Sequence, residues 1–214
     1  MTPSELPAVL PVALTLRGRT CLVVGGGRVA TDKVRTLLAA DARVHVVSPT
    51  VTEELGQLVS EREDVTWRAG EFAITDLDEV RLVVTATANR DVDDRIYASA
   101  DERGLWVNSA DDPERCSFYL TGTVRRDPVV VAITTAGASP AMARYLRERL
   151  DAYLEAELGD VARILYDVRR EILAADEGSE GRPWSAAITD ELFALVRDGR
   201  LDDARQYVRA RVAP

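Results

Sequence analysis

The residues of this sequence whose types and spacing point most directly to chemistry are three glycines that follow an apolar run. The run Thr20–Val24 leads into Gly25, Gly26 and Gly27, and Ala30 follows three positions later. This spacing matches the dinucleotide fingerprint G-x-G-x-x-G/A, in which a turn without side chains lets a pyrophosphate approach the backbone. The free amides and the positive dipole end of the following helix would bind the phosphates. The pattern predicts a dinucleotide site; the alternative is a plain strand-to-helix turn, which needs only one or two of these glycines.

The sequence around the glycines is typical of a strand–helix–strand unit. An amphipathic run, Val29–Leu38, follows the turn, and a second apolar strand is expected at Arg43–Val47. At the end of that strand, where an acid usually binds the ribose hydroxyls, Ser48 and Pro49 stand instead. No basic cluster replaces the acid, apart from Arg28 inside the turn, so these residues leave the choice between NAD and NADP open.

Carboxylates are the candidates for general acid–base work. Asp111 and Asp112 follow a strand expected at Leu105–Val107, at the sheet edge where reacting groups collect. The alternative is that this Asp-Asp-Pro sequence is a turn or a helix cap. The one histidine, His45, lies inside an apolar strand and is expected to pack there rather than to act as a base. With one histidine and two cysteines far apart in the sequence, no resident metal site is expected.

A second candidate anion site lies in the loop Thr134–Pro140. Its small residues expose backbone amides ahead of a helix, with Ser139 in the N-cap position and Pro140 in the first helical position. Arg144 and Arg147 on that helix could pair with a polyanionic ligand. The alternative is that these arginines are solvated surface residues.

Strands and helices alternate through the first half of the chain, which predicts a parallel sheet with helices on both faces. Further strands are expected at 65–68 and 82–85, and helices at 51–60 and 91–103. A short edge strand is expected at 6–16, ahead of the strand that ends in the glycines.

The pattern changes after residue 113. Two β-rich runs, 117–125 and 129–135, have no helix between them and therefore predict an antiparallel pair. Helices are expected beyond them at residues 141–158, 161–174, 185–196 and 202–212. The predicted fold class is α/β, with a Rossmann-like parallel-sheet domain at 1–113, a β-rich segment at 114–145 and a helical domain at 146–214.

Charge and hydropathy argue against several classes of protein. The 214 residues carry a formal net charge of −9, which disfavours a nucleic-acid partner bound through its phosphates. No apolar run reaches the length of a membrane span, and the N-terminal residues lack the basic region and cleavage pattern of a secretory signal. We therefore expect a cytoplasmic protein with neither a membrane nor a nucleic acid as partner.

Several separated motifs, taken together and in order, resemble one known family. They are Gly25–Ala30 with Lys33, Val46–Pro49, Thr85–Thr87, Asn108 with Asp111–Pro113, Cys116–Phe118, and Ser139–Pro140 with Ala143–Arg144. This set resembles the precorrin-2 dehydrogenase family, a module that stands alone in some organisms and forms the N-terminal half of siroheme synthase in others. Because no methyltransferase sequence follows, the resemblance is to the stand-alone form.

The resemblance implies NAD-dependent oxidation of precorrin-2 to sirohydrochlorin in siroheme biosynthesis. It implies a homodimer whose β-rich segments interlock, and in some members a second activity that inserts ferrous iron into sirohydrochlorin. Asp111 matches the catalytic aspartate of the family. The implied cofactor-binding residues are Gly25, Gly26, Gly27, Arg28, Val29, Ala30, Ser48, Pro49, Thr85, Ala86, Thr87 and Asn108, and the implied substrate-binding residues are Thr135, Gly137, Ser139 and Arg144.

The sequence departs from the family at two places and leaves two other functions open. Ala136 stands in place of a glycine, and Leu120–Gly122 stands where many relatives have a proline. One alternative function is a different NAD(P)-dependent oxidoreductase acting on a smaller substrate. The other is a module that binds NAD(H) for redox sensing without catalysis, with the helical region as a docking surface.

Overall fold

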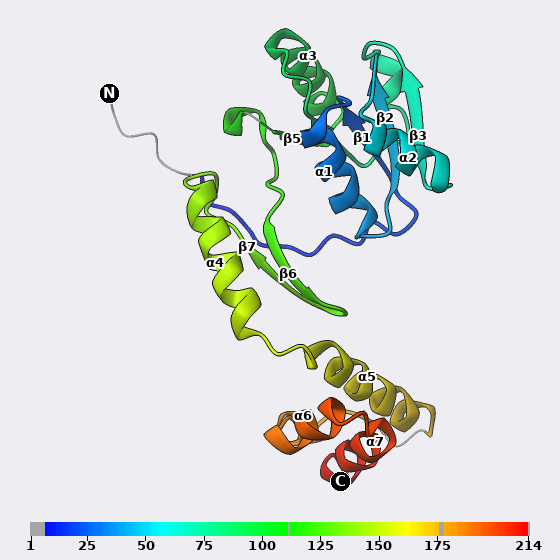
Figure 1. Ribbon diagram of the computed structural model, residues 1–214, viewed down its shortest axis with the longest axis vertical. Helices are drawn as coiled ribbons and strands as arrows, with labels where there is room; N and C mark the ends of the chain where they lie inside the picture. The colour runs from blue at the N-terminus through cyan, green and yellow to red at the C-terminus, as the bar shows by residue number, and fades with distance from the viewer. Residues whose placement is uncertain (1–6, 111, 176–177, 214) are drawn as a thin grey trace. The chain divides into compact units, whose positions relative to one another are not determined.

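The chain divides into two compact units, Met1–Leu120 and Thr121–Pro214. The computed structural model describes residues 7–110, 112–175 and 178–213. Figure 1 shows the parallel sheet of the first unit and the hairpin and helices of the second.

The first unit is built on a five-stranded parallel sheet in the order β3-β2-β1-β4-β5 (Figure 1). Its strands and helices are β1 (Thr20–Val24), α1 (Arg28–Leu38), β2 (Arg43–Ser48), α2 (Glu53–Glu61), β3 (Val65–Ala69), β4 (Leu82–Thr85), α3 (Arg90–Asp101) and β5 (Trp106–Ser109), with short 3-10 helices at Ile74–Leu77 and Pro113–Arg115. The predicted parallel sheet is therefore confirmed. Its winding reverses between β1 and β4, and sheets of this kind bind ligands at the carboxyl ends of the strands at such a point.

Side chains of β1 alternate between two cores on opposite faces of the sheet. Cys21 and Val23 belong to a core that contains Leu55 of α2, whereas Leu22 belongs to a core that contains Ile96 of α3. All five side chains are fully buried. Burial on both faces is the reason that the central strands are continuously apolar instead of alternating with polar residues.

The edge strand predicted at 6–16 is wrong for its described part. Residues 7–16 form no strand and run as an irregular segment. Pro7 and Pro11 have no amide hydrogen to donate to a neighbouring strand, and Leu10 is 83% exposed. The apolar spacing wrongly predicted a strand here, because spacing alone does not show whether a segment pairs with a sheet.

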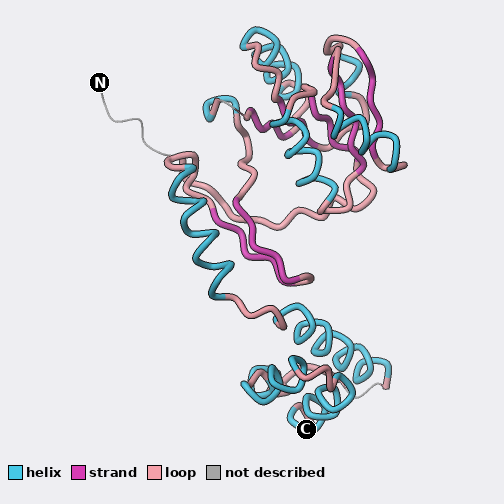
Figure 2. The backbone as a smooth tube through the Cα atoms, in the orientation of Figure 1, coloured by secondary structure: helices cyan, strands magenta, loops and turns pink. Residues whose placement is uncertain are grey.

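The second unit begins with an antiparallel hairpin of β6 (Gly122–Arg126) and β7 (Val129–Ile133), which confirms the predicted pair (Figure 2). The first strand begins later than the expected residue 117, because Ser117 is held by the first unit. Its amide donates to the carbonyl of Val107 at 2.9 Å, and its hydroxyl accepts from the amide of Val107 at 2.7 Å. Ser117 therefore pairs with β5 rather than extending the hairpin.

The predicted helical region is also confirmed. The helices are α4 (Pro140–Tyr153), α5 (Leu158–Ala174), α6 (Asp190–Arg197) and α7 (Leu201–Arg211), with a 3-10 helix at Trp184–Ala187 before α6. Ile164 and Ile172 of α5 pack with Leu192 of α6 and Val208 of α7 in one apolar core. The last three helices thus bury a common core of their own.

Two of the predicted helices are divided in the structure. The helix expected at 141–158 ends at Tyr153, where the Arg126 guanidinium of the hairpin donates to the carbonyls of Asp151 at 2.9 Å and Leu154 at 3.2 Å. The helix expected at 185–196 is broken at Thr189, whose hydroxyl accepts from the amide of Leu192 and caps α6. The first break depends on a residue distant in sequence, whereas the second is an ordinary N-cap.

Replacing Leu55 with alanine is expected to lower the free energy of unfolding by roughly 2–5 kcal/mol, because the side chain is fully buried under the sheet. Leu10→Ala is the matched control, since the same atoms are removed from an exposed position, and its effect should stay within about 0.5 kcal/mol. Urea denaturation of both variants measures the difference. Equal effects of the two substitutions would contradict the assigned core.

Candidate functional site

Gly25 and Gly26 form a turn in which backbone lies directly against backbone. Gly25 has φ of +128°, and a Cβ there would lie 2.3 Å from the carbonyl oxygen of Ala86 after β4. A Cβ on Gly26 would lie 1.9 Å from the carbonyl oxygen of Thr50 and 2.7 Å from the hydroxyl of Ser48 after β2. Neither position accepts a side chain, because the turn is enclosed between the ends of two other strands.

Gly27 is different, because no residue that the structure describes requires a glycine there. Its φ is −81°, which any residue adopts, and a Cβ on it would meet no heavy atom within 4 Å. Gly27 is the N-cap of α1, and its carbonyl accepts from the amide of Thr31 at 3.0 Å. The open space therefore lies at the start of a helix, whose first amides have no partners within the helix and whose dipole favours an anion. This arrangement fits the pyrophosphate of a dinucleotide.

A cavity of about 620 Å³ opens at the carboxyl edge of the sheet. It is lined by Val24–Gly27, Val47–Thr52, Gly70–Phe72, Ala86–Asn89, Val92 and Arg95. The structure thus brings together seven of the predicted cofactor-binding residues: Gly25, Gly26, Gly27, Ser48, Pro49, Ala86 and Thr87. Five others, Arg28, Val29, Ala30, Thr85 and Asn108, are not part of this lining.

The cavity is also lined by residues that the sequence did not indicate, among them the segment Gly70–Phe72 and Val92 and Arg95 of α3. The segment follows β3, which is the neighbour of β2 in the sheet. The rule that ligands bind beyond the carboxyl ends of parallel strands would have indicated it, had the strand order been known. Arg95 reaches the cavity from the second turn of α3, a position without a motif.

Thr85 and Asn108 are buried at the ends of β4 and β5, at 1% and 5% exposure. Among the described residues, the Thr85 hydroxyl and the Asn108 side-chain oxygen have no hydrogen-bond partner, although the Asn108 amide nitrogen donates to the carbonyl of Phe118 at 3.0 Å. Leaving a buried polar atom unpaired costs about 1–3 kcal/mol, and neither of these atoms belongs to a residue of the cavity lining.

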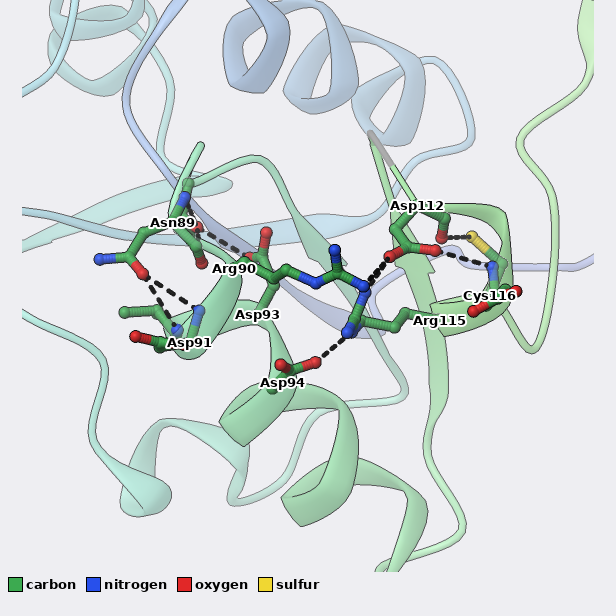
Figure 3. A network of polar contacts seen from close by, with 11 residues as sticks. Asn89, Arg90, Asp91, Asp93, Asp94, Asp112, Arg115 and Cys116 are labelled. Atoms are coloured by element: carbon green, nitrogen blue, oxygen red, sulfur yellow. Dashed lines mark hydrogen bonds and ion pairs between the residues drawn. The ribbon is translucent and has the colours of Figure 1, made fainter.

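Asp111, the predicted catalytic residue, lies outside the described residues. Its neighbour Asp112 has a structural role (Figure 3). Its carboxylate accepts a hydrogen bond from the amide of Glu114 at 3.0 Å and so caps the 3-10 helix. The same carboxylate forms ion pairs with Arg115 and, at 3.8 Å, with Arg90 of α3. For Asp112, therefore, the cap interpretation of the Asp-Asp-Pro sequence is confirmed.

His45 and Cys116 carry titratable groups near the sheet, and neither is poised as a nucleophile or base. Burial lowers the pKa of His45, which favours the neutral ring, and its Nδ1 lies 2.8 Å from the hydroxyl of Thr66, in keeping with the expected packed role. Burial raises the pKa of the Cys116 thiol, whose sulfur lies 3.3 Å from the amide of Ser109. A neutral thiol held between backbone groups is a packing group.

The predicted substrate loop belongs to the second unit and is internally hydrogen-bonded. The Thr135 hydroxyl accepts from the amide of Ser139 at 3.1 Å, and the Ser139 hydroxyl accepts from the amide of Met142 at 3.2 Å, which confirms the predicted N-cap. Ala136 has φ of +51° and so occupies the conformation that favours glycine. On the helix, Arg144 forms no ion pair with any described residue.

The described part of the chain contains no cluster of three or more His, Cys, Asp or Glu side chains that could hold a metal ion. Within that same part, none of the helices is both long enough and apolar enough to cross a membrane.

Comparison with known proteins gives a family, two relatives and a solved structure that this chain resembles. Residues 12–122 match the family described as "Putative NAD(P)-binding". Siroheme synthase 1 of Yersinia enterocolitica is 40% identical over 202 residues, which cover 94% of this chain and 43% of that protein. Siroheme synthase of Nitrosomonas europaea is 35% identical over 201 residues, which cover 93% of this chain and 42% of that protein.

A solved structure described as "SirC, precorrin-2 dehydrogenase" has the same fold, with a TM-score of 0.70 at 24% sequence identity. The match covers 94% of this chain and 98% of that chain. By contrast, this chain spans less than half the length of the two siroheme synthases.

Gly27→Ala is expected to separate ligand binding from folding. Because the new methyl group meets no protein atom, the free energy of unfolding should change by less than about 0.5–1 kcal/mol. The methyl group would occupy the space of the pyrophosphate, so the Kd for NAD(H) should rise about tenfold or more, which corresponds to about 1.4 kcal/mol.

Gly26→Ala is the contrasting variant, because its methyl group would overlap the Thr50 carbonyl and should destabilise the fold itself. Calorimetry and thermal denaturation measure binding and stability of each variant. Normal NAD(H) affinity in a folded Gly27→Ala protein would contradict the assignment of this turn to the pyrophosphate.

Proposed function

The chain belongs to the NAD(P)-binding family that its residues 12–122 match, and on that premise we propose that it is a precorrin-2 dehydrogenase of siroheme biosynthesis. The observation that carries the proposal is the open space at Gly27, where the start of α1 faces a cavity of about 620 Å³. The names of the similar proteins supply the substrate class. NAD is the proposed oxidant, and the product is sirohydrochlorin.

The reaction needs little from the protein beyond positioning and one base. Precorrin-2 loses a hydride and a proton, giving sirohydrochlorin, NADH and H⁺; the nicotinamide of a bound NAD supplies the hydride acceptor. The amides at the start of α1 hold the phosphates, and the strand ends beyond β1 and β4 form the wall of the cavity. A carboxylate then suffices to take the proton.

Asp111 is the proposed base. In the sequence it comes two residues after the end of β5, and catalytic groups of such folds collect beyond the carboxyl ends of the strands. The adjacent Asp112 is a poor alternative, because its carboxylate is paired with Arg115 and Arg90 and is oriented by a hydrogen bond from the amide of Glu114. Of the two acids, Asp111 is therefore the better candidate to accept a proton.

The substrate carries several carboxylates, which a chain of net charge −9 binds through local cations and amides. We assign this role to the loop of Thr135, Gly137 and Ser139 together with Arg144. Two properties support the assignment: Arg144 has no ion-pair partner among the described residues, and Ser139 begins a 14-residue helix with no acidic residue in its first turn.

A homodimer is part of the proposal. Helix α4 buries none of its residues against the described part of the chain, and Met142, Tyr145 and Leu146 are 50%, 51% and 37% exposed. The hairpin of β6 and β7 is two-stranded, and an isolated hairpin is marginally stable in water. A second copy of the chain that covers α4 and the hairpin would bury this surface.

Mixing the protein with NAD and precorrin-2 tests the activity. The proposal requires the absorbance spectrum of sirohydrochlorin together with an equal amount of NADH. A redox-sensing module would bind NAD(H) and give neither, and an oxidoreductase for a smaller substrate would leave precorrin-2 unchanged. Addition of ferrous iron to the sirohydrochlorin formed, compared with the same solution without protein, tests for iron insertion.

Asp111→Asn is expected to lose most of its turnover, about a hundredfold or more, while its NAD affinity stays unchanged. Asp112→Asn is the matched control, since asparagine also caps a helix and the variant should keep its turnover despite a modest loss of stability. Steady-state kinetics and NAD titration distinguish the two. Wild-type turnover by the Asp111 variant would show that another group is the base.

Tyr145→Glu is expected to convert the dimer into a monomer, because it places a charge on the exposed apolar side of α4. Tyr166→Glu on α5 is the matched control, since Tyr166 is 59% exposed and lies outside the proposed interface. Sedimentation velocity measures the masses. A wild-type monomer, or a dimer that survives Tyr145→Glu unchanged, would contradict this interface.

A further inference from the structure

The acid that usually ends the second strand of a dinucleotide-binding sheet is absent, and the structure brings another acid to the same cavity. Ser48 ends β2, and its carbonyl accepts from the Trp67 indole at 3.0 Å and from the Gly70 amide at 3.2 Å. The chain beyond β3 is therefore fastened to the end of β2. The next residue, Glu71, lines the same cavity as Ser48.

The loop that carries Glu71 is held in place by a neighbouring ion pair. The Arg68 guanidinium donates to the carbonyl of Glu71 at 2.9 Å and pairs through Nε with Asp76 at 2.9 Å. The Asp76 side chain is 7% exposed, and it also accepts from the amide of Ala73 at 2.8 Å. The backbone at Glu71 is thus fixed, whereas its carboxylate forms no hydrogen bond or ion pair with any described residue.

The Glu71 carboxylate supplies the negative charge of the described cavity lining. Glu71 and Arg95 are the two charged side chains of its described lining. The Arg95 guanidinium donates to the carbonyl of Phe72 at 3.2 Å and lies over the Phe72 ring, 5.9 Å from its centre. Arg95 is therefore held by protein groups, whereas Glu71 is available to a ligand.

We propose that Glu71 determines the preference of this site for NAD over NADP. Its carboxylate accepts hydrogen bonds from the ribose hydroxyls of the adenosine half, as the missing acid of β2 would, and it repels a 2′-phosphate. The inference rests on the proposed NAD-dependent function and names the residue that selects the cofactor. It makes Glu71 a specificity-determining residue with no part in the chemical step.

The test measures dinucleotide affinity directly, without the tetrapyrrole. Kd values for NAD and NADP are determined by calorimetry for the wild-type protein, Glu71→Gln and Glu71→Arg. Wild type should prefer NAD, Glu71→Gln should lower that preference about tenfold, and Glu71→Arg should favour NADP, each tenfold change being about 1.4 kcal/mol. Because Glu71 is exposed, all variants should fold, and thermal denaturation is the measurement that checks this.

Glu63→Gln and Glu63→Arg are the matched controls. Glu63 is exposed, precedes β3 and lies outside the cavity lining, so the same charge changes there should leave the preference unaltered. An unchanged preference in both Glu71 variants overturns the inference. An equal loss of affinity for NAD and NADP also overturns it, because Glu71 would then contact the adenine ring that both dinucleotides share. Failure of the wild-type protein to bind either dinucleotide would instead overturn the proposed function.

Discussion

The close approach of three strand ends around the glycine turn is the constraint on which the rest of the structure depends. Gly25 lies against the backbone after β4, and Gly26 lies against the backbone after β2, at separations that exclude any side chain. These contacts fix the position of the turn relative to the ends of β2 and β4. They also leave the amides at the start of α1 directed into open space at Gly27, which is what a pyrophosphate requires.

The same fastening of strand ends distributes the polar groups of the cavity. Ser48 fills the usual position of an acid, and its carbonyl instead anchors the chain beyond β3. The negative charge of the cavity then comes from Glu71, on a loop that Arg68 and Asp76 hold rigid. A function that sequence motifs assign to one strand is in this way transferred to its neighbour, because parallel strands end at a common edge.

In the second unit, one arginine joins the hairpin to helix α4. Arg126 of the hairpin donates to the last carbonyls of α4, and so it ends that helix and fixes it to β6. The helices that follow bury an apolar core of their own, whereas α4 buries no residue against the described part of the chain. An amphipathic helix with no buried face is unusual in a monomer, and the proposed association of two copies would bury this face.

The sequence by itself determined the local features: the glycine turn, the continuously apolar strands, the cap at Ser139, and an antiparallel pair within residues 117–135. Each depends on residues adjacent in the chain, so propensity and spacing suffice. The family followed from several such motifs in order. Strand order, by contrast, was decided only by the tertiary structure, and with it the position of Glu71 beside Ser48, the commitment of Asp112 to Arg90 and Arg115, and the end of α4 at Arg126. Apart from the pair of Asp112 and Arg115, which are three residues apart, these contacts join residues distant in the sequence, and no local pattern encodes which of many arginines and carboxylates will meet.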